Sequence, residues 1–304
     1  MEYDLHQGEK LESRIRRLEA SDERQYMINE NYEVYEKQGA PLGAIAFHYH
    51  NFYEILYVLE GEYSAMVENQ TYHLHKGDFL LIDQNVMHKY HYMEKKHDSS
   101  KRIILWITRQ MLEKLGEGDM ELAACFERRD SCAYHFPVYY EELLRGYLLK
   151  LSMTQIPESR LPGEKALLDR GCLILFFTYL NLLCRKREYL FKQENLVQHP
   201  LAKQVGSYVE EHIGGKITVE ELAEQVHMSK YHFLRKFKEL TGVTVHAFVT
   251  DKRLIKACRA ISEGMNISQA YQAAGFSDYS SFLRNFKNAY GISPGKYKDF
   301  YPDS

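Results

Sequence analysis

The chain has 304 residues, of which 45% are hydrophobic and 27% charged, and its formal net charge is −3. This composition is typical of a soluble globular protein, and the length favours two domains over one. Five scattered cysteines without a C-x-x-C spacing argue against a disulfide framework and a zinc ribbon. Residues 1–17 lack the apolar run of a secretory signal, so we expect a cytoplasmic protein without a membrane partner.

Short runs rich in Val, Ile, Tyr and Phe follow one another between residues 42 and 109. Turn signals around Gly61, Asn69 and Gly77 separate these runs. Evenly spaced short strands of this kind predict an antiparallel sandwich or barrel.

A histidine-rich pattern lies in the same region. It reads H-x-H-x3-E-x6-G from His48 to Gly61, and a second part runs from Gly77 through Asp83 and Asn85 to His88. These spacings resemble the two cupin motifs, although Asp83 and Asn85 stand where the second motif favours Pro and Gly. The resemblance implies that four residues occupy the metal-holding positions of metallocupins, namely His48, His50, Glu54 and His88.

Two interpretations of these four residues stay open. Residues 48, 50 and 54 share strand parity, so on one strand they would point into one barrel interior. Three imidazoles and a carboxylate there suit a divalent transition metal such as manganese, iron, nickel, copper or zinc. The same residues could instead form a hydrogen-bonded cluster that lines a pocket for a small-molecule effector.

The pattern becomes helical from about Val138. We expect a helix over 139–151, a loop over 157–163 and one or two helices over 164–193. The apolar run from Cys172 to Cys184 has 13 residues, fewer than the roughly 20 needed to span a bilayer. These helices either form a dimer interface or cover an open side of the barrel. Residues 195–199 are the expected linker to an all-helical region.

One sixteen-residue pattern occurs twice in that region. Residues 233–248 and 282–297 both fit F-L-R-x-F-K-x-x-x-G-[VI]-[ST]-x-x-x-[FY]. A short apolar helix, a turn and a capping serine (Ser229 or Ser277) precede each copy. Each copy therefore predicts a helix-turn-helix, and a duplicated unit is rarely accidental.

The first unit begins with a capping box from Thr218 to Glu221. In its second helix Phe233 and Phe237 lie four residues apart and are expected to face the core. A rotation of about 100° per residue then leaves outward the side chains of Lys230, Tyr231, Leu234, Arg235 and Lys238. A helix that exposes Arg, Lys and Tyr near its N-terminus suits a DNA major groove.

The second unit repeats this pattern with Phe282 and Phe286 inward. The residues expected on or near its outward face are Asp278, Tyr279, Ser280, Arg284 and Lys287. Gly242 and Gly291 are expected to end the two helices in the left-handed conformation. Residues 247–262 predict a connecting helix about 24 Å long, which could hold the two recognition helices about one DNA turn, ~34 Å, apart.

Residues from about 200 to 300 resemble the DNA-binding domain of the AraC/XylS family of bacterial transcription regulators. The segments L-A-E-Q-V-x-M-S and G-F-S-D-Y-S-S-F-L-R-N-F-K-x-x-x-G-I-S-P carry that resemblance. It implies that Tyr231, Leu234 and Arg235 face bases in the first unit, and residues 278–280 with Arg284 in the second. His227 departs from the family, where Gly is common, and so does Lys236, where an apolar residue is usual.

The sequence therefore predicts an α+β multidomain protein. Residues 1–137 form a cupin-like antiparallel β-barrel for the effector, 138–197 a helical dimerisation segment, and 198–304 an all-α domain with tandem helix-turn-helix units. By the resemblance, the partners are promoter or operator DNA, a small-molecule effector such as a carbohydrate, a second copy of the chain, and RNA polymerase. The alternative is a metal-dependent cupin enzyme fused to a DNA-binding module.

Overall fold

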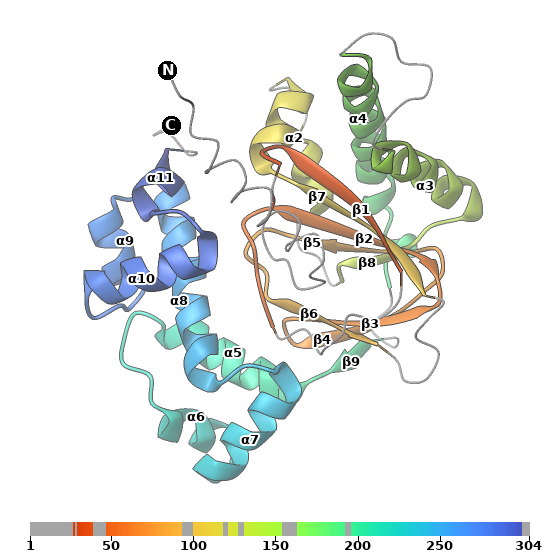
Figure 1. The fold of residues 1–304 in the computed structure, drawn as a ribbon. Coiled ribbons are helices and arrows are strands. Elements are labelled where there is room, and N and C mark those ends of the chain that lie inside the picture. The colour runs from red at the N-terminus through yellow and green to blue at the C-terminus, as the bar shows by residue number, and fades with distance from the viewer. Residues whose placement is uncertain are drawn as a thin grey trace, which may run out of the picture.

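A computed structural model describes residues 27, 29–38, 47–92, 100–117, 121–126, 131–153, 163–191 and 196–299. A two-sheet β-domain occupies the N-terminal half, and an all-helical domain lies beside it (Figure 1). This arrangement confirms the predicted fold class. Residues 1–17 and most of the loop predicted over 157–163 lie outside the described ranges.

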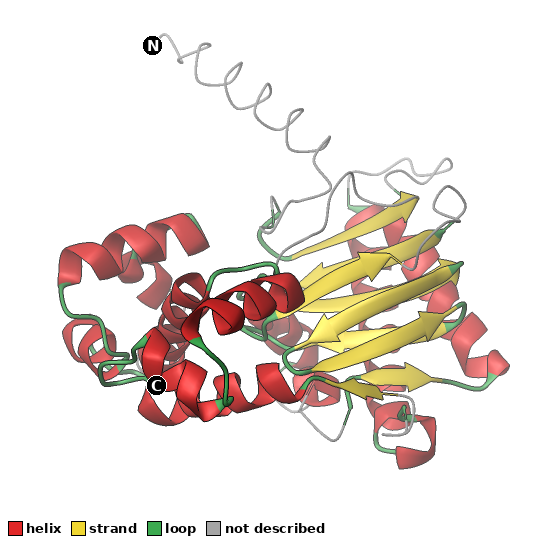
Figure 2. Ribbon diagram, turned by 90° about the horizontal axis from the view of Figure 1, so that it is seen from below, coloured by secondary structure: helices red, strands yellow, loops and turns green. Residues whose placement is uncertain are grey.

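Two antiparallel sheets face each other in the β-domain. The first has the order β1 (Tyr32–Gln38), β7 (Lys101–Ile107), β2 (Tyr53–Glu60), β5 (Asp78–Ile82) and β8 (Ala133–His135). The second has the order β6 (His88–Tyr92), β3 (Glu62–Val67), β4 (Gln70–His75) and β9 (Leu196–Gln198). Figure 2 shows the strands running side by side with helices at both ends of the domain.

Strand β2 is buried on both faces. Ile55 and Tyr57 belong to the core shared with the helices, whereas Leu56 and Val58 belong to the core between the two sheets. Because successive side chains of a strand point to opposite faces, the continuous apolar run of β2 is explained by a helical layer behind it.

That layer consists of α2 (Arg109–Gly116), the 3-10 helix η2 (Leu122–Phe126), α3 (Val138–Ser152) and α4 (Glu164–Cys184). The helix predicted over 164–193 ends at Cys184, and the 3-10 helix η3 (Arg187–Tyr189) follows. By length and composition alone, the 21-residue α4 could cross a membrane. One face of it, with Leu173, Phe176 and Phe177, is buried against the β-domain, as expected of a core helix.

The segment expected to be a linker is instead part of a sheet. Residues 196–198 form β9, which pairs antiparallel with β4. His199 then donates its backbone N–H to the Asn69 carbonyl, and helix α5 starts at Pro200. The helical domain is therefore attached to the second sheet by strand pairing.

The helical domain contains two three-helix units joined by one long helix. The first has α5 (Pro200–His212), α6 (Val219–Gln225) and α7 (Lys230–Thr241), and the second has α9 (Ile267–Ala273), α10 (Tyr279–Tyr290) and α11 (Pro294–Lys298). Helix α8 (Val245–Ser262) connects them and has 18 residues, two more than predicted. Phe233 and Phe237 lie in one core, and Phe282 and Phe286 in another.

Candidate functional site

The first helix-turn-helix begins with the predicted capping box. The Thr218 side chain accepts from the Glu221 backbone N–H, and the Glu221 carboxylate accepts from the Thr218 N–H. Ser229 caps α7 in the same way, through the His232 N–H. In the turn between α6 and α7, the backbone of His227 has a φ of +53°. The family's usual Gly fits this left-handed conformation, and His227 adopts it despite its side chain.

Helix α7 confirms most of the predicted outward face. Lys230, Arg235 and Lys238 are exposed, and Tyr231 is 79% exposed. Leu234 differs, because it is half-buried and packs against the core of this unit. The outward face therefore offers an aromatic ring and three cations, of which two have carboxylate partners, Lys230 with Glu220 and Arg235 with Glu239.

Helix α10 presents a second face of the same kind. Ser280, Arg284 and Lys287 are exposed, and Tyr279 is 44% exposed. Asp278, which the resemblance assigned to base contact, caps the helix by accepting from the Ser281 N–H at 2.7 Å, so the cap is Asp278 and not the predicted Ser277. Asp278 therefore stabilises the start of α10, although the residue is exposed.

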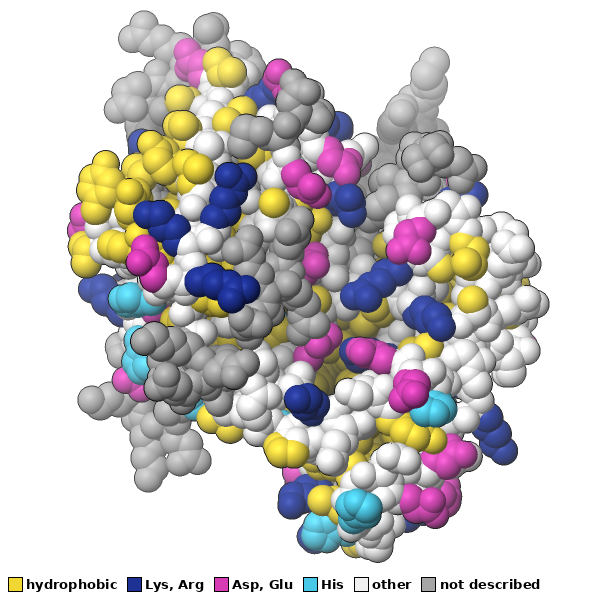
Figure 3. All heavy atoms as spheres, turned by 180° about the vertical axis from the view of Figure 1, so that it is seen from behind, with side chains coloured by type: hydrophobic (Ala, Val, Ile, Leu, Met, Phe, Trp, Pro, Cys, Tyr) yellow, Lys and Arg dark blue, Asp and Glu magenta, His cyan; other side chains and the backbone are white. Residues whose placement is uncertain are grey.

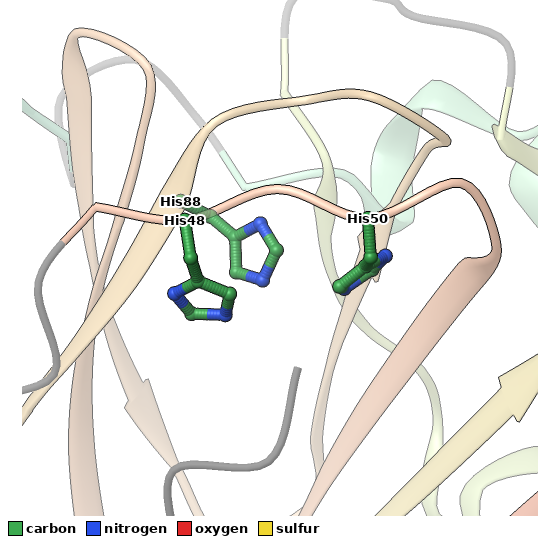
Figure 4. Close-up of side chains that lie close together, drawn as sticks. All are labelled: His48, His50 and His88. Atoms are coloured by element: carbon green, nitrogen blue, oxygen red, sulfur yellow. The ribbon is translucent and has the colours of Figure 1, made fainter. Parts of the chain in front are cut away.

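The predicted histidine cluster forms, but its members lie on different backbone segments from those expected. Of its members only Glu54 lies in β2, while His48 and His50 precede that strand. His48 instead forms an isolated antiparallel bridge with His88 at the start of β6. The parity argument for a single strand was wrong, yet one imidazole nitrogen from each of the three histidines lies within 4.8 Å of the other two (Figure 4).

Hydrogen bonds fix the cluster. His50 Nδ1 lies 2.9 Å from the Phe52 carbonyl, and His50 Nε2 lies 2.8 Å from Glu54 Oε2. The Tyr90 hydroxyl donates to Glu54 Oε1 at 2.6 Å. Burial lowers the pKa of His50. Burial raises the pKa of Glu54, but the imidazoles of His50 and His88 beside the carboxylate outweigh it and hold that pKa well below its usual value. Imidazoles thus lie beside a carboxylate, a donor set that suits a divalent transition metal.

The space between the two sheets is filled by side chains. Leu56, Val58, Tyr63 and Tyr90 are among the residues that pack there. A cavity beside them, lined by Val67 and other residues, measures only about 10 Å³. An effector inside the barrel thus remains a prediction that the packing of the described residues does not favour.

A larger cavity, about 440 Å³, lies between the two domains. The β-domain contributes His50, Phe52 and Gln84, helix α2 contributes Lys114, and the helical domain contributes Tyr290 and Ile292. The His50 ring stacks on Phe52 with centroids 3.9 Å apart. Sequence reasoning missed this site, because no local pattern brings α2 next to the end of α10.

Helix α4 carries an unpaired apolar stripe on its outer face. Leu168, Leu175 and Leu182 recur every seven residues and are 54%, 45% and 53% exposed. Figure 3 shows hydrophobic side chains gathered over this side of the molecule. Because apolar residues at heptad spacing form the seam of coiled coils, the stripe is a candidate surface for a second copy.

Known protein families match both the β-domain and the helical domain. The family described as "AraC-like ligand binding domain" matches residues 31–106, and that described as "Helix-turn-helix domain" matches residues 222–299. The probable transcriptional regulator LumQ of Photobacterium leiognathi is 26% identical over 84% of this chain and 92% of its own.

Two further proteins are similar over most of the chain. The uncharacterized HTH-type transcriptional regulator YbfI of Bacillus subtilis (strain 168) is 23% identical over 77% of this chain and 79% of its own. The structure of ToxT from Vibrio cholerae O395 covers 91% of this chain and 100% of its own, with 13% identity and a TM-score of 0.37. With a ligand-binding domain followed by a helix-turn-helix domain, the chain belongs to the AraC family of DNA-binding transcriptional regulators.

Proposed function

We propose that this regulator acts in the cytoplasm as a homodimer that reads a DNA operator with both recognition helices of each subunit. The observation that carries the proposal is the pair of equivalent helices, α7 and α10, each with an exposed N-terminal half above a buried Phe pair. Contact with RNA polymerase stays a prediction from the family resemblance.

Bases and phosphates are read by different side chains of these helices. Arg235 and Arg284 occupy the same position in the two copies, and both are exposed. An Arg fork can bind guanine in a bidentate manner, so we assign these two residues to bases, together with Tyr231, Tyr279 and Ser280. Lys230, Lys238 and Lys287 would anchor phosphates, which fix the position of the protein on the duplex.

The effector would bind in the cavity between the domains. Its volume of about 440 Å³ is within the range of small-molecule sites. Phe52 and Ile292 contribute apolar side chains, while Gln84 and Gln110 offer amides and Lys114 a cation. A small polar metabolite with one apolar face, such as a carbohydrate, suits this lining. Because residues of both domains line the cavity, a bound effector would change how the two domains are arranged relative to each other.

The buried histidine cluster does not favour the alternative of an enzyme. Glu54, His50 and His88 are 1%, 4% and 0% exposed, whereas a catalytic metal needs an open position for water or substrate. Turnover of a small molecule by the metal-loaded protein would restore the enzyme hypothesis.

DNA binding by the full chain tests the proposal. An operator is first selected from the promoter region next to the gene, and fluorescence anisotropy then measures its affinity. We expect Arg235→Ala and Arg284→Ala each to weaken binding by about 1–3 kcal/mol. Lys256→Ala, which removes an exposed cation of α8, is the matched control. Unchanged affinity in both arginine variants would refute the assignment.

A further inference from the structure

A second cavity lies where the β-domain meets the first three-helix unit. Its volume is about 140 Å³, and residues of the β-domain, α5, α7 and α8 line it. Helix α5 contributes more of the lining than α7 or α8, so we call it the α5 cavity. Within the part of the chain that the structure describes, it shares no lining residue with the larger cavity beside α2 and α10. The two cavities are therefore separate sites.

The walls of the α5 cavity are mainly apolar. Phe47 and Met87 come from the β-domain, Phe237 from α7 and Phe248 from α8, and all four are buried. The rings of Phe237 and Phe248 meet edge to face, with centroids 5.2 Å apart. Protein interiors contain few voids larger than a water molecule, and an apolar cavity of about 150 Å³ binds benzene. The α5 cavity thus has room for one six-membered ring.

Gly206 leaves this space open. It is the middle residue of the 13-residue α5, and it lines the cavity. No heavy atom of the described residues lies within 4 Å of a Cβ built on it. Glycine in the interior of a helix lowers stability relative to alanine, and no close neighbour requires its small size here. The effect of Gly206 at this position is therefore to keep a side chain out of the cavity.

The charges around the cavity balance one another. Lys252 Nζ donates to Glu210 Oε1 at 2.7 Å and lies 3.5 Å from Glu68 Oε1. Lys252 is only 9% exposed, so this ion pair lies at the cavity wall, whereas Lys203 and Ser207 are exposed at the rim. A charged ligand would compete with the ion pair or stay unpaired among the aromatic rings, which is unfavourable. The lining therefore favours an uncharged ligand.

We propose that the α5 cavity binds a small uncharged molecule that has one aromatic ring and one hydroxyl group. The ring would lie among Phe47, Phe237 and Phe248, since aromatic rings pack favourably edge to face. The hydroxyl would lie near Ser207, because a hydroxyl can both donate and accept a hydrogen bond. Such a ligand would touch the recognition helix α7 from within the protein. This site is additional to the effector cavity and does not depend on it.

Benzyl alcohol tests the site in the full-length wild type without DNA. Met87 lines the α5 cavity and Met27 lines the larger cavity, so the two methyl groups report on different sites. In protein labelled with ¹³C at the methionine methyls, we expect a saturable shift of the Met87 signal, which Met87→Leu identifies. The Met27 signal should stay in place. A shift of Met27 without one of Met87, or a shift of neither, would overturn the proposal.

Gly206→Leu blocks the cavity and has a matched control. The leucine side chain should fill the space and weaken the binding of benzyl alcohol by more than about tenfold, with an unchanged circular dichroism spectrum. Gly146→Leu adds the same side chain in α3, where a Cβ likewise has no described heavy atom within 4 Å, and it should bind like the wild type. Equal affinity of a folded Gly206→Leu variant would show that the ligand binds elsewhere. If that variant fails to fold, the comparison of Met87 with Met27 in the wild type decides.

Benzoate tests the chemical class of the ligand. It has the same ring as benzyl alcohol but carries a carboxylate in place of the alcohol group. We expect benzoate to shift the Met87 signal with an affinity more than about tenfold lower, because its charge must enter an apolar space whose cation is already paired. Benzoate that binds as tightly as benzyl alcohol would contradict the uncharged class. Since no DNA is present, either result is distinct from a failure to bind an operator.

Discussion

Gly275, in the turn of the second helix-turn-helix, lies directly against Ile213, just after α5 of the first. A Cβ built on Gly275 would lie 2.1 Å from the Ile213 carbonyl oxygen and 3.1 Å from Arg253 Nε. From α8, Arg253 also donates to the carbonyls of Ile213 at 3.3 Å and Gly215 at 2.7 Å. The two units are therefore fixed to each other by this contact as well as by the connecting helix.

Gly275→Ala should consequently disturb both units. Non-bonded heavy atoms do not approach as closely as 2.1 Å, so the backbone must shift, and φ +85° at this residue adds strain for any side chain. We expect the free energy of unfolding to fall by more than about 2 kcal/mol and the operator affinity to fall as well. Thermal melting and anisotropy measure the two effects.

Gly291→Ala is the matched control for this change. Its φ of +71° carries a similar backbone strain, but nothing lies within 4 Å of the added Cβ. It should cost only about 1–2 kcal/mol and leave operator affinity nearly unchanged. Equal effects of the two substitutions would show that the contact between Gly275 and Ile213 does not align the units.

The helix-turn-helix units could be predicted because their signals are local. The capping box at Thr218, the Phe pairs and the glycines with left-handed φ at 242 and 291 each depend on residues within a few positions. The structure confirms all of them. Two residues of the predicted outward faces have other contacts that a helical projection does not show. Leu234 packs against the core of its unit, and Asp278 caps α10.

Contacts between distant segments could not be predicted in the same way. The bridge of His48 to His88, the pairing of β9 with β4 and the cavity between α2 and α10 all join residues far apart in the chain. The four cupin-like positions did indicate the histidine cluster, although the backbone brings His48 and His50 there without a common strand.

Lys238 and Lys287 should control the salt dependence of DNA binding. Both are exposed on the outward sides of α7 and α10. If each contacts one phosphate, Lys238→Ala and Lys287→Ala should each reduce the slope of log affinity against log salt by about 0.9, with similar losses for all DNA sequences. Anisotropy titrations between low and moderate salt measure this slope. A loss confined to the selected operator would instead indicate base contact.

Asp251 should make stability depend on pH. Burial in α8 raises the pKa of its carboxyl from 3.8 to about 7. Between these values the folded state keeps a proton that the unfolded state has lost. Stability from this group therefore falls as pH rises through that window, and the penalty is complete above about pH 7.

Asp251→Asn removes this penalty. We expect the variant to be more stable than the wild type at pH 8, by about 2–4 kcal/mol, and the difference to shrink toward pH 4. Denaturant unfolding at a series of pH values gives the comparison. A stability difference that does not change with pH would show that Asp251 is ionised in the folded protein.

Leu175 should be essential for dimerisation through α4. It is the middle residue of the stripe formed with Leu168 and Leu182, and its side chain is 45% exposed in the single chain. Leu175→Asp places a charge in the seam, where desolvation without a partner is unfavourable. Sedimentation equilibrium should then show a monomer, and operator affinity should fall because one subunit alone retains half of the contacts. Leu167→Asp changes a neighbouring leucine that is 73% exposed and lies off the stripe, so it should remain dimeric. If both variants dimerise like the wild type, the second copy binds elsewhere, and the stripe on α4 needs another partner.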